Sequence, residues 1–187
     1  LQLFPLNGKA YFWKKIKIME TIQVEKRSRA KEQKTEIPEY LIYEVLDGKT
    51  IFRKGYLDVI NKTKTLEEIM ACSGIQSDIL DYLQDILYTR VGRKNYKFYS
   101  NETGVHIEHK NNLSSDLAIY LRSVLTSDKI TNKYVNVPAK IYLEVDLKGE
   151  LEDMTETGYI FLKSQQLLNF GAERVIWILT KPKLVIV

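Results

Sequence analysis

The segment Lys140-Ile-Tyr-Leu-Glu-Val-Asp146 decides the fold, because it reads as a central strand that carries an acidic residue in an apolar setting. Ile141, Leu143 and Val145 surround Glu144 and indicate that the strand is buried. A buried carboxylate needs an ionic partner or a metal ion, since an unpaired charge is costly to remove from water. Glu144 is therefore the first candidate for a functional residue.

Alternating and apolar runs before and after this segment predict further strands. A hairpin is expected where Asp47-Gly48 supplies a tight turn between two such runs. The strands expected from the sequence are Tyr40–Leu46, Thr50–Arg53, Tyr96–Tyr99, Val105–Glu108, Leu117–Leu121, Lys140–Asp146, Val175–Leu179 and Leu184–Val187.

Three segments have the signals of helices. Thr65–Met70 begins with a Thr three residues before a Glu, which is typical of a capping box. Ser73–Val91 reads as a long helix, and Thr155–Phe170 reads as a helix that stops at Gly171. In the long helix we expect an apolar face of Ile75, Ile79, Leu83, Ile86 and Leu87, with Asp78, Asp81 and Asp85 off that face.

The order of these elements predicts an α/β or α+β fold, in which helices cover the faces of a central mixed sheet. The length of 187 residues suits one domain at 36–187 with a basic N-terminal arm at 1–35. We also expect Leu1–Ile18 to be an upstream stretch that is not native, with Met19 as the natural start.

Charge is distributed unevenly along the chain. Residues 1–35 hold nine Lys/Arg and three Glu, whereas the remainder holds 19 basic and 21 acidic residues. The body is thus about neutral, and charge alone does not indicate nucleic-acid binding. The single cysteine, Cys72, excludes an internal disulfide framework, and no secretion signal is recognisable, so a cytoplasmic location is expected.

A second acid and a lysine are placed so that they can join Glu144. Asp116 follows the expected loop Asn111–Ser115 at the start of an apolar strand, and the two carboxylates meet at one sheet end if their strands pair. Mg²⁺ prefers hard oxygen ligands and few protein carboxylates. Lys163, on the following helix, is placed to stabilise the negative charge that develops on a phosphate during cleavage. Taken singly, each residue also fits an ordinary role as a turn, edge or solvated residue.

With these residues in place, Tyr40–Val187 resembles the Uma-type family of restriction endonucleases, within the PD-(D/E)XK nuclease superfamily. The matching elements are Tyr43–Gly48, a helix opening at Gln76, Ser115-Asp116, Pro138–Val145, Lys163 eight residues ahead of Gly171, and Glu173–Ile178. The resemblance implies a restriction-endonuclease-like core and hydrolysis of DNA with Mg²⁺ or Mn²⁺. It implies that Asp116 and Glu144 bind the metal, that Lys163 is the catalytic lysine and that Glu44 completes the site.

The sequence departs from the family pattern at several positions. Ser115 replaces a Pro, Gln76 replaces a common His, and Leu147-Lys148 replaces a Ser-Pro pair. Asp146 stands where the wider superfamily carries its lysine, and it could join the metal site or be neutralised by Lys148.

Two functions remain open from the sequence. The first is a metal-dependent DNA endonuclease, for which a homodimer would match the two-fold symmetry of a duplex. The second is a catalytically silent nuclease-fold protein that serves as an interaction or nucleic-acid-binding module, which the slight negative charge of the body favours.

Overall fold

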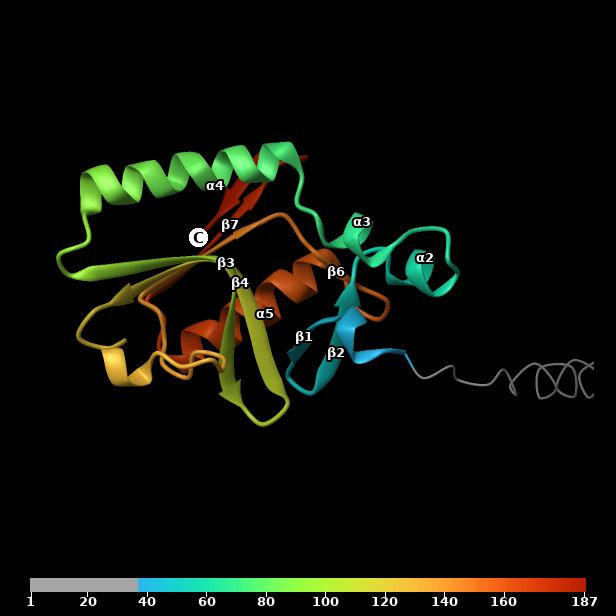
Figure 1. Ribbon diagram of the computed structural model, residues 1–187, viewed down its shortest axis with the longest axis horizontal. Helices are drawn as coiled ribbons and strands as arrows, with labels where there is room; N and C mark the ends of the chain where they lie inside the picture. The colour runs from blue at the N-terminus through green and yellow to red at the C-terminus, as the bar shows by residue number, and fades with distance from the viewer. Residues whose placement is uncertain (1–36) are drawn as a thin grey trace, which may run out of the picture. The chain divides into compact units, whose positions relative to one another are not determined.

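An eight-stranded mixed sheet lies at the centre of this computed structural model, which describes residues 37–187 (Figure 1). The predicted basic arm at 1–35 and the expectation about Leu1–Ile18 lie outside the described residues. The strands are β1 (Ile42–Leu46), β2 (Lys49–Arg53), β3 (Tyr96–Glu108), β4 (Asn111–Leu121), β5 (Ile141–Val145), β6 (Gly149–Glu150), β7 (Arg174–Leu179) and β8 (Leu184–Ile186). Their order is β6-β2-β1-β4-β5-β7-β8, and β3 pairs with β4.

The sheet combines local antiparallel pairs with one parallel crossover. β1 and β2 form the predicted hairpin, in which Asp47 and Gly48 both have positive φ, of 51° and 76°. This is the backbone geometry of a two-residue hairpin turn. β3 pairs antiparallel with β4, β4 antiparallel with β5, and β5 parallel with β7. The parallel pair requires a crossover, which is supplied by α5 (Glu156–Phe170).

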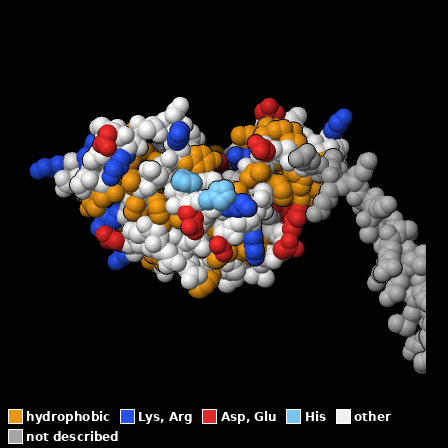
Figure 2. Space-filling view, turned by 90° about the horizontal axis from the view of Figure 1, so that it is seen from below, with side chains coloured by type: hydrophobic (Ala, Val, Ile, Leu, Met, Phe, Trp, Pro, Cys, Tyr) orange, Lys and Arg blue, Asp and Glu red, His pale blue; other side chains and the backbone are white. Residues whose placement is uncertain are grey.

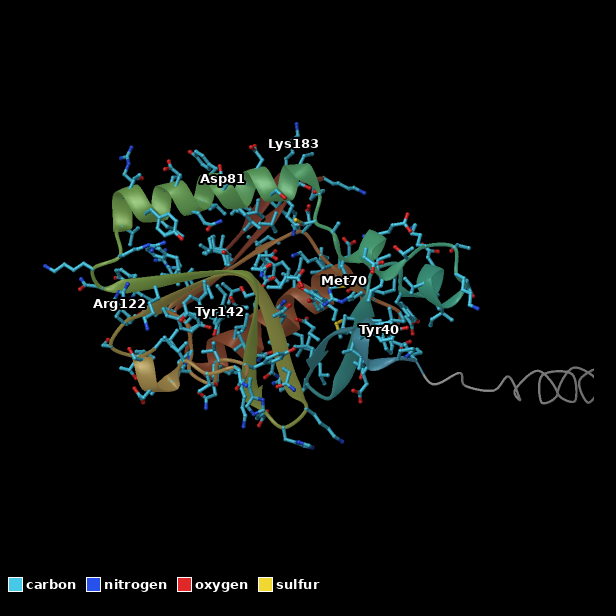
Figure 3. The ribbon with its side chains drawn as sticks, viewed as in Figure 1. Tyr40, Met70, Asp81, Arg122, Tyr142 and Lys183 are labelled. Carbon is cyan, nitrogen blue, oxygen red and sulfur yellow. The ribbon has the colours of Figure 1, made fainter. Side chains whose placement is uncertain are left out.

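Two helices cover opposite faces of the sheet. The α4 helix (Gly74–Ile86), continued by a π-helical turn at Leu87–Val91, packs on the face that carries Leu117, Ile119 and Leu143. The α5 helix packs on the other face, against a core that includes Tyr120, Tyr142 and Trp177. Residues alternate between faces along a strand, so Glu144 shares the α5 face with Tyr142. Figure 3 shows Tyr142 inside the fold and Asp81 on the outer side of α4.

Short helices complete the described part. The α2 helix (Tyr56–Ile60) follows β2, and α3 (Leu66–Met70) begins with the predicted capping box. Thr65 accepts a hydrogen bond from the Glu68 amide, and the Glu68 carboxylate accepts one from the Thr65 amide. Turns of 3₁₀ helix lie at Glu39–Leu41 and Ser127–Lys129.

The α/β class, the central mixed sheet, the flanking helices and the N-terminal hairpin are confirmed. Three local predictions are wrong. The segments Tyr96–Tyr99 and Val105–Glu108 are one strand, β3, because a bulge absorbs the positive φ of Asn101 and Glu102. Residues 111–115 are not a loop but the first half of β4. Ile75 is exposed, and Leu80 joins Leu83 and Leu87 on the packed face of α4.

Within residues 37–187, no helix has both the length and the apolar character needed to cross a membrane.

Candidate active site

The predicted site residues lie where β1 and β5 diverge along the same edge of β4, a place called the fork below. β4 is long enough to pair along one edge with two strands, with β1 at Asn112 and with β5 from Leu117 to Ile119. Between these two pairings, β4 has no neighbouring strand among residues 37–187 on that edge to form backbone hydrogen bonds with. Side chains form hydrogen bonds with the free backbone groups instead.

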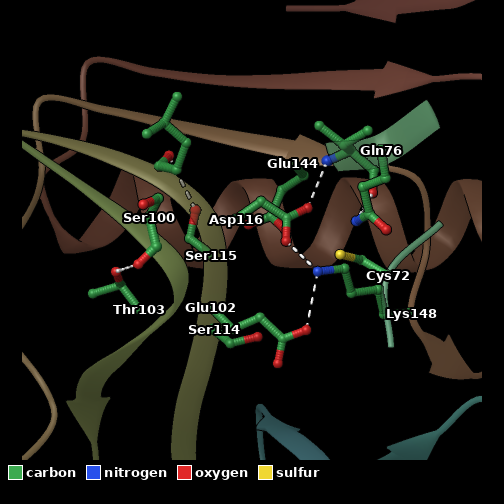
Figure 4. A network of polar contacts seen from close by, with 12 residues as sticks. Cys72, Gln76, Ser100, Glu102, Thr103, Ser114, Ser115, Asp116, Glu144 and Lys148 are labelled. Atoms are coloured by element: carbon green, nitrogen blue, oxygen red, sulfur yellow. Dashed lines mark hydrogen bonds and ion pairs between the residues drawn. The ribbon is translucent and has the colours of Figure 1, made fainter. Parts of the chain in front are cut away.

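Several hydrogen bonds at this point join side chains to the main chain. The Glu44 carboxylate accepts from the Ser114 amide at 3.2 Å, and the Asp116 carboxylate accepts from the Val145 amide at 2.8 Å. The Ser115 hydroxyl donates to the Leu143 carbonyl at 3.3 Å (Figure 4). Buried backbone groups require such partners, so the fork holds Glu44 and Asp116 in fixed orientations.

The structure brings together the four residues that the sequence singled out. Glu44 lies on β1, Asp116 on β4, Glu144 on β5 and Lys163 on α5, and each is at most 3% exposed. The Lys163 Nζ lies 3.0 Å from the Glu44 Oε2 and 3.4 Å from the Glu144 Oε2. Lys163 reaches these acids because α5 lies across the face that Glu144 shares.

Tyr159 adds a neutral hydrogen-bonding group to this cluster. It lies one helical turn before Lys163, so both side chains lie on the same face of α5. Its hydroxyl donates to the Glu44 Oε1 and lies 3.4 Å from the Lys163 Nζ. Burial, the main cause, raises the pKa of Tyr159, which keeps the hydroxyl protonated as a donor.

Burial and neighbouring charges act in opposite directions on the central pair. Burial and, to a smaller extent, the negative charges of Asp116 and Glu44 raise the pKa of Glu144, the positive charge of Lys163 lowers it, and the net result is a pKa of about 8. Burial alone would lower the pKa of Lys163, but the carboxylates of Glu144 and Glu44 raise it well above its ordinary value. Lys163 is therefore a permanent cation in this cluster.

Among the described residues, one atom of the cluster has no hydrogen-bond partner. The Glu144 Oε1 is buried and has no hydrogen-bond partner within the described part of the chain. Such an atom forfeits the interactions it had with water, so it marks a place where a proton or a cation is favoured. Residues 37–187 contain no group of three or more His, Cys, Asp and Glu residues arranged for a metal ion. A metal here would have two protein carboxylates, Asp116 and Glu144, and a shell completed by water, as suits Mg²⁺.

Sequence reasoning missed the direct partner of Asp116. The Lys148 ammonium donates to the Asp116 Oδ1 and also to the Glu102 Oε1, at 3.0 Å for the second contact (Figure 4). Glu102 reaches this position from the bulge in β3, whose positive φ re-aims its side chain. The position of Lys148 four residues after Glu144 was visible in the sequence, but its partners come from distant strands.

Asp146 lies away from the acids and has a structural role. Its carboxylate accepts hydrogen bonds from the amide and hydroxyl of Thr180, at 2.7 and 2.6 Å. The expectation that Lys148 neutralises Asp146 is therefore wrong, because Lys148 contacts Asp116 and Glu102 instead. Gln76, at the position of a common family His, donates from its amide to the Val145 carbonyl at 3.0 Å and so joins α4 to the end of β5.

Comparison with solved structures finds a crystal structure from Anabaena variabilis of a "putative nuclease belonging to DUF820". It matches with a TM-score of 0.46 and 13% sequence identity, over 72% of this chain and 64% of that one. The match thus spans less than two thirds of that protein's length. No protein-family model and no curated protein matches this chain.

Proposed function

We propose that the protein is a metal-dependent nuclease that hydrolyses phosphodiester bonds in DNA, as the resemblance to the Uma-type restriction endonucleases also implies. The observation that carries the proposal is the buried Glu144 Oε1, which has no hydrogen-bond partner among residues 37–187 and lies beside a second carboxylate on the neighbouring strand. Oxygen donors of this kind suit Mg²⁺ or Mn²⁺.

Asp116 and Glu144 would hold the metal, which supplies a Lewis acid and lowers the pKa of a bound water. Asp116 is oriented for this by the Val145 amide, and Glu144 by Lys163. The contact of Lys148 with the Asp116 Oδ1 has to open before that oxygen can bind a cation.

In this proposal Lys163 affects the metal site indirectly, through the two carboxylates that it contacts, those of Glu44 and Glu144. Its side chain is fully buried and its Nζ lies between Glu44 and Glu144. The positive charge of Lys163 lowers the pKa of Glu144 against the effect of burial and so favours the ionised carboxylate, which is the form that binds metal. Lys163 is thus a positioning residue, with Glu44 and Tyr159 as the groups that fix its ammonium.

A second candidate function has its own support in the geometry. Lys163, Glu44 and Tyr159 already form a closed, buried network, which a catalytically silent interaction module would keep for stability alone. In that case Glu144 would carry a proton on Oε1 and would bind no metal.

The decisive experiment combines metal binding with cleavage. Calorimetric titration of Mg²⁺ and Mn²⁺ should give heat with the wild type and none with Glu144→Gln. Cleavage of supercoiled plasmid should fall at least about 100-fold in Glu144→Gln, because a ligand for transition-state charge is lost. Glu108→Gln, an equal change at an exposed position on β3, should behave as the wild type. No metal heat and no cleavage in the wild type would leave the silent module as the function.

A further inference from the structure

A pocket beside the acids collects positive side chains. Its volume is about 290 Å³, and it is formed by the end of β2, α3, the start of α4 and the β5–β6 connection. The charged residues in its lining are Arg53, Lys54, Lys64, Lys148, Glu68 and Glu102. The lining therefore has an excess of positive charge, whereas the sequence from residue 36 onward has a slight excess of acids. A concave surface that gathers several cations can attract an anionic ligand.

The two carboxylates of the lining are already engaged. Glu68 caps α3 by accepting from the Thr65 amide at 2.7 Å. Glu102 lies between Lys148, at 3.0 Å, and Arg53, at 3.6 Å. Glu102 thus holds Arg53 and Lys148 in place, while Asp58 pairs with Lys64 at 2.6 Å and Asp116 pairs with Lys148. The cations of the pocket therefore lie among carboxylates, and what the pocket offers a ligand is the hydrogen-bonding capacity of Arg53 that residues 37–187 leave unused.

Arg53 has hydrogen-bonding capacity that the protein does not use. Its Nε is buried and has no acceptor among residues 37–187, and its Nη1 is 3.6 Å from Glu102, beyond hydrogen-bond length. The guanidinium also lies over the Tyr43 ring, with 5.7 Å between its Cζ and the ring centroid, which limits its movement. A planar guanidinium with free donors suits the paired oxygens of a phosphate group.

Lys148 joins this pocket to the acids. It lines the pocket, and the same ammonium contacts the Asp116 Oδ1. A phosphate in the pocket would draw Lys148 toward itself, which frees Asp116 for a cation. Substrate binding and exposure of the metal carboxylate are thus coupled through one side chain.

We propose that this pocket binds a phosphodiester group of the nucleic-acid backbone, with Arg53 and Lys148 as its main donors and Lys54 and Lys64 at its rim. The proposal rests on the nuclease function proposed above, because it identifies where the substrate backbone enters. The pocket lies just below the usual range of roughly 300–1,000 Å³ for small-molecule sites, a size that suits one nucleotide unit rather than a larger ligand.

The test uses the whole 187-residue chain without divalent metal, and two small probes. Thymidylyl-(3′→5′)-thymidine carries one phosphodiester and no terminal phosphate, and inorganic phosphate has no diester. Binding is followed by amide chemical shifts in NMR. We expect the dinucleotide to shift amides around Arg53 and Lys148, and its Kd to rise at least five-fold in Arg53→Gln. Lys110→Gln removes an equal charge at the exposed tip of the β3–β4 hairpin and should leave the Kd unchanged.

A second variant guards against misfolding of Arg53→Gln. Lys54→Gln combined with Lys64→Gln changes two exposed side chains at the rim and should raise the Kd at least two-fold. Equal Kd values in all variants would overturn the proposal, as would binding of inorganic phosphate without binding of the dinucleotide. Because no metal or cleavage enters this measurement, dinucleotide binding by a protein that does not cleave would count against the nuclease function alone.

Discussion

At Glu144, burial and the positive charge of Lys163 have opposite effects on the pKa of the carboxyl group. Burial, helped by the negative charges of Asp116 and Glu44, raises the pKa from an ordinary value of 4.5 to about 8, because Lys163 offsets only part of the effect. The folded protein therefore holds this proton more tightly than the unfolded chain does. The resulting stabilisation is complete below about pH 4.5 and is lost as the pH rises through about 8.

This linkage predicts a difference between two pH profiles. Without metal, the free energy of unfolding of the wild type should fall from pH 5 to pH 8 relative to that of Glu144→Gln, because Gln has no proton to lose. Urea unfolding at several pH values measures this. Glu108→Gln, at an exposed site, should follow the wild-type profile. Parallel profiles for the wild type and Glu144→Gln would contradict the raised pKa.

Lys163→Met should be strongly destabilising, because it leaves Glu44 and Glu144 buried without their cation. Breaking a buried pair from one side costs about 3–5 kcal/mol. The double variant Lys163→Met/Glu144→Gln should recover part of this loss in urea unfolding, since one buried carboxylate is removed. Lys140→Met breaks a surface pair with Glu173 and should cost less than about 1 kcal/mol. A small effect of Lys163→Met would show that the cluster does not depend on this charge.

Among the elements, the β5–β6 connection carries Asp146 and Lys148, whose interaction partners could not be predicted from the sequence. Asp146 has a φ of 59° and joins this connection to Thr180 at the end of β7. Asp146→Ala should therefore cost roughly 2–4 kcal/mol in urea unfolding, from two lost hydrogen bonds and a strained backbone. Asp146→Asn keeps an acceptor for the Thr180 amide and tolerates positive φ, so its cost should be clearly smaller. Equal costs would argue against this bonding.

The elements fixed by local chemistry were predictable, and those fixed by distant partners were not. The hairpin turn at Asp47-Gly48 and the capping box at Thr65 depend on residues close in the chain. The first half of β4 reads as a loop because Ser114 and Ser115 are polar, yet their partners are Glu44 and the Leu143 carbonyl. No local pattern reveals a fork between strands.

The same distinction applies to the candidate site. Glu144 was identifiable because a carboxylate in an apolar strand is unusual, and Asp116 because it precedes an apolar run. Lys148 was not assigned correctly, since its contacts come from β3 and β4. The bulge that brings Glu102 to Lys148 depends on backbone geometry, which hydrophobic periodicity does not encode.

For the whole molecule, the uneven distribution of charge along the chain predicts which part would supply the salt-dependent affinity in the proposed binding of DNA. Residues 1–35 have a net charge of +6, and the rest of the chain has a net charge of −2. Counterion release makes DNA affinity fall with salt in proportion to the number of phosphates neutralised, with a slope of about −0.9 per contact on a log–log plot. Most of the salt-dependent affinity should therefore come from residues 1–35, and the pocket should contribute few contacts.

This division can be measured by truncation. A chain beginning at Glu36 keeps the core clusters that pack the sheet, so it should fold, and fluorescence anisotropy should show weaker duplex binding with a flatter salt dependence. Arg53→Gln in the untruncated chain should change the slope by only about one contact. If truncation leaves the slope unchanged, the described part of the chain itself supplies the phosphate contacts, despite its slight negative charge. The pocket around Arg53 and Lys148 would then be one part of a longer backbone-binding surface.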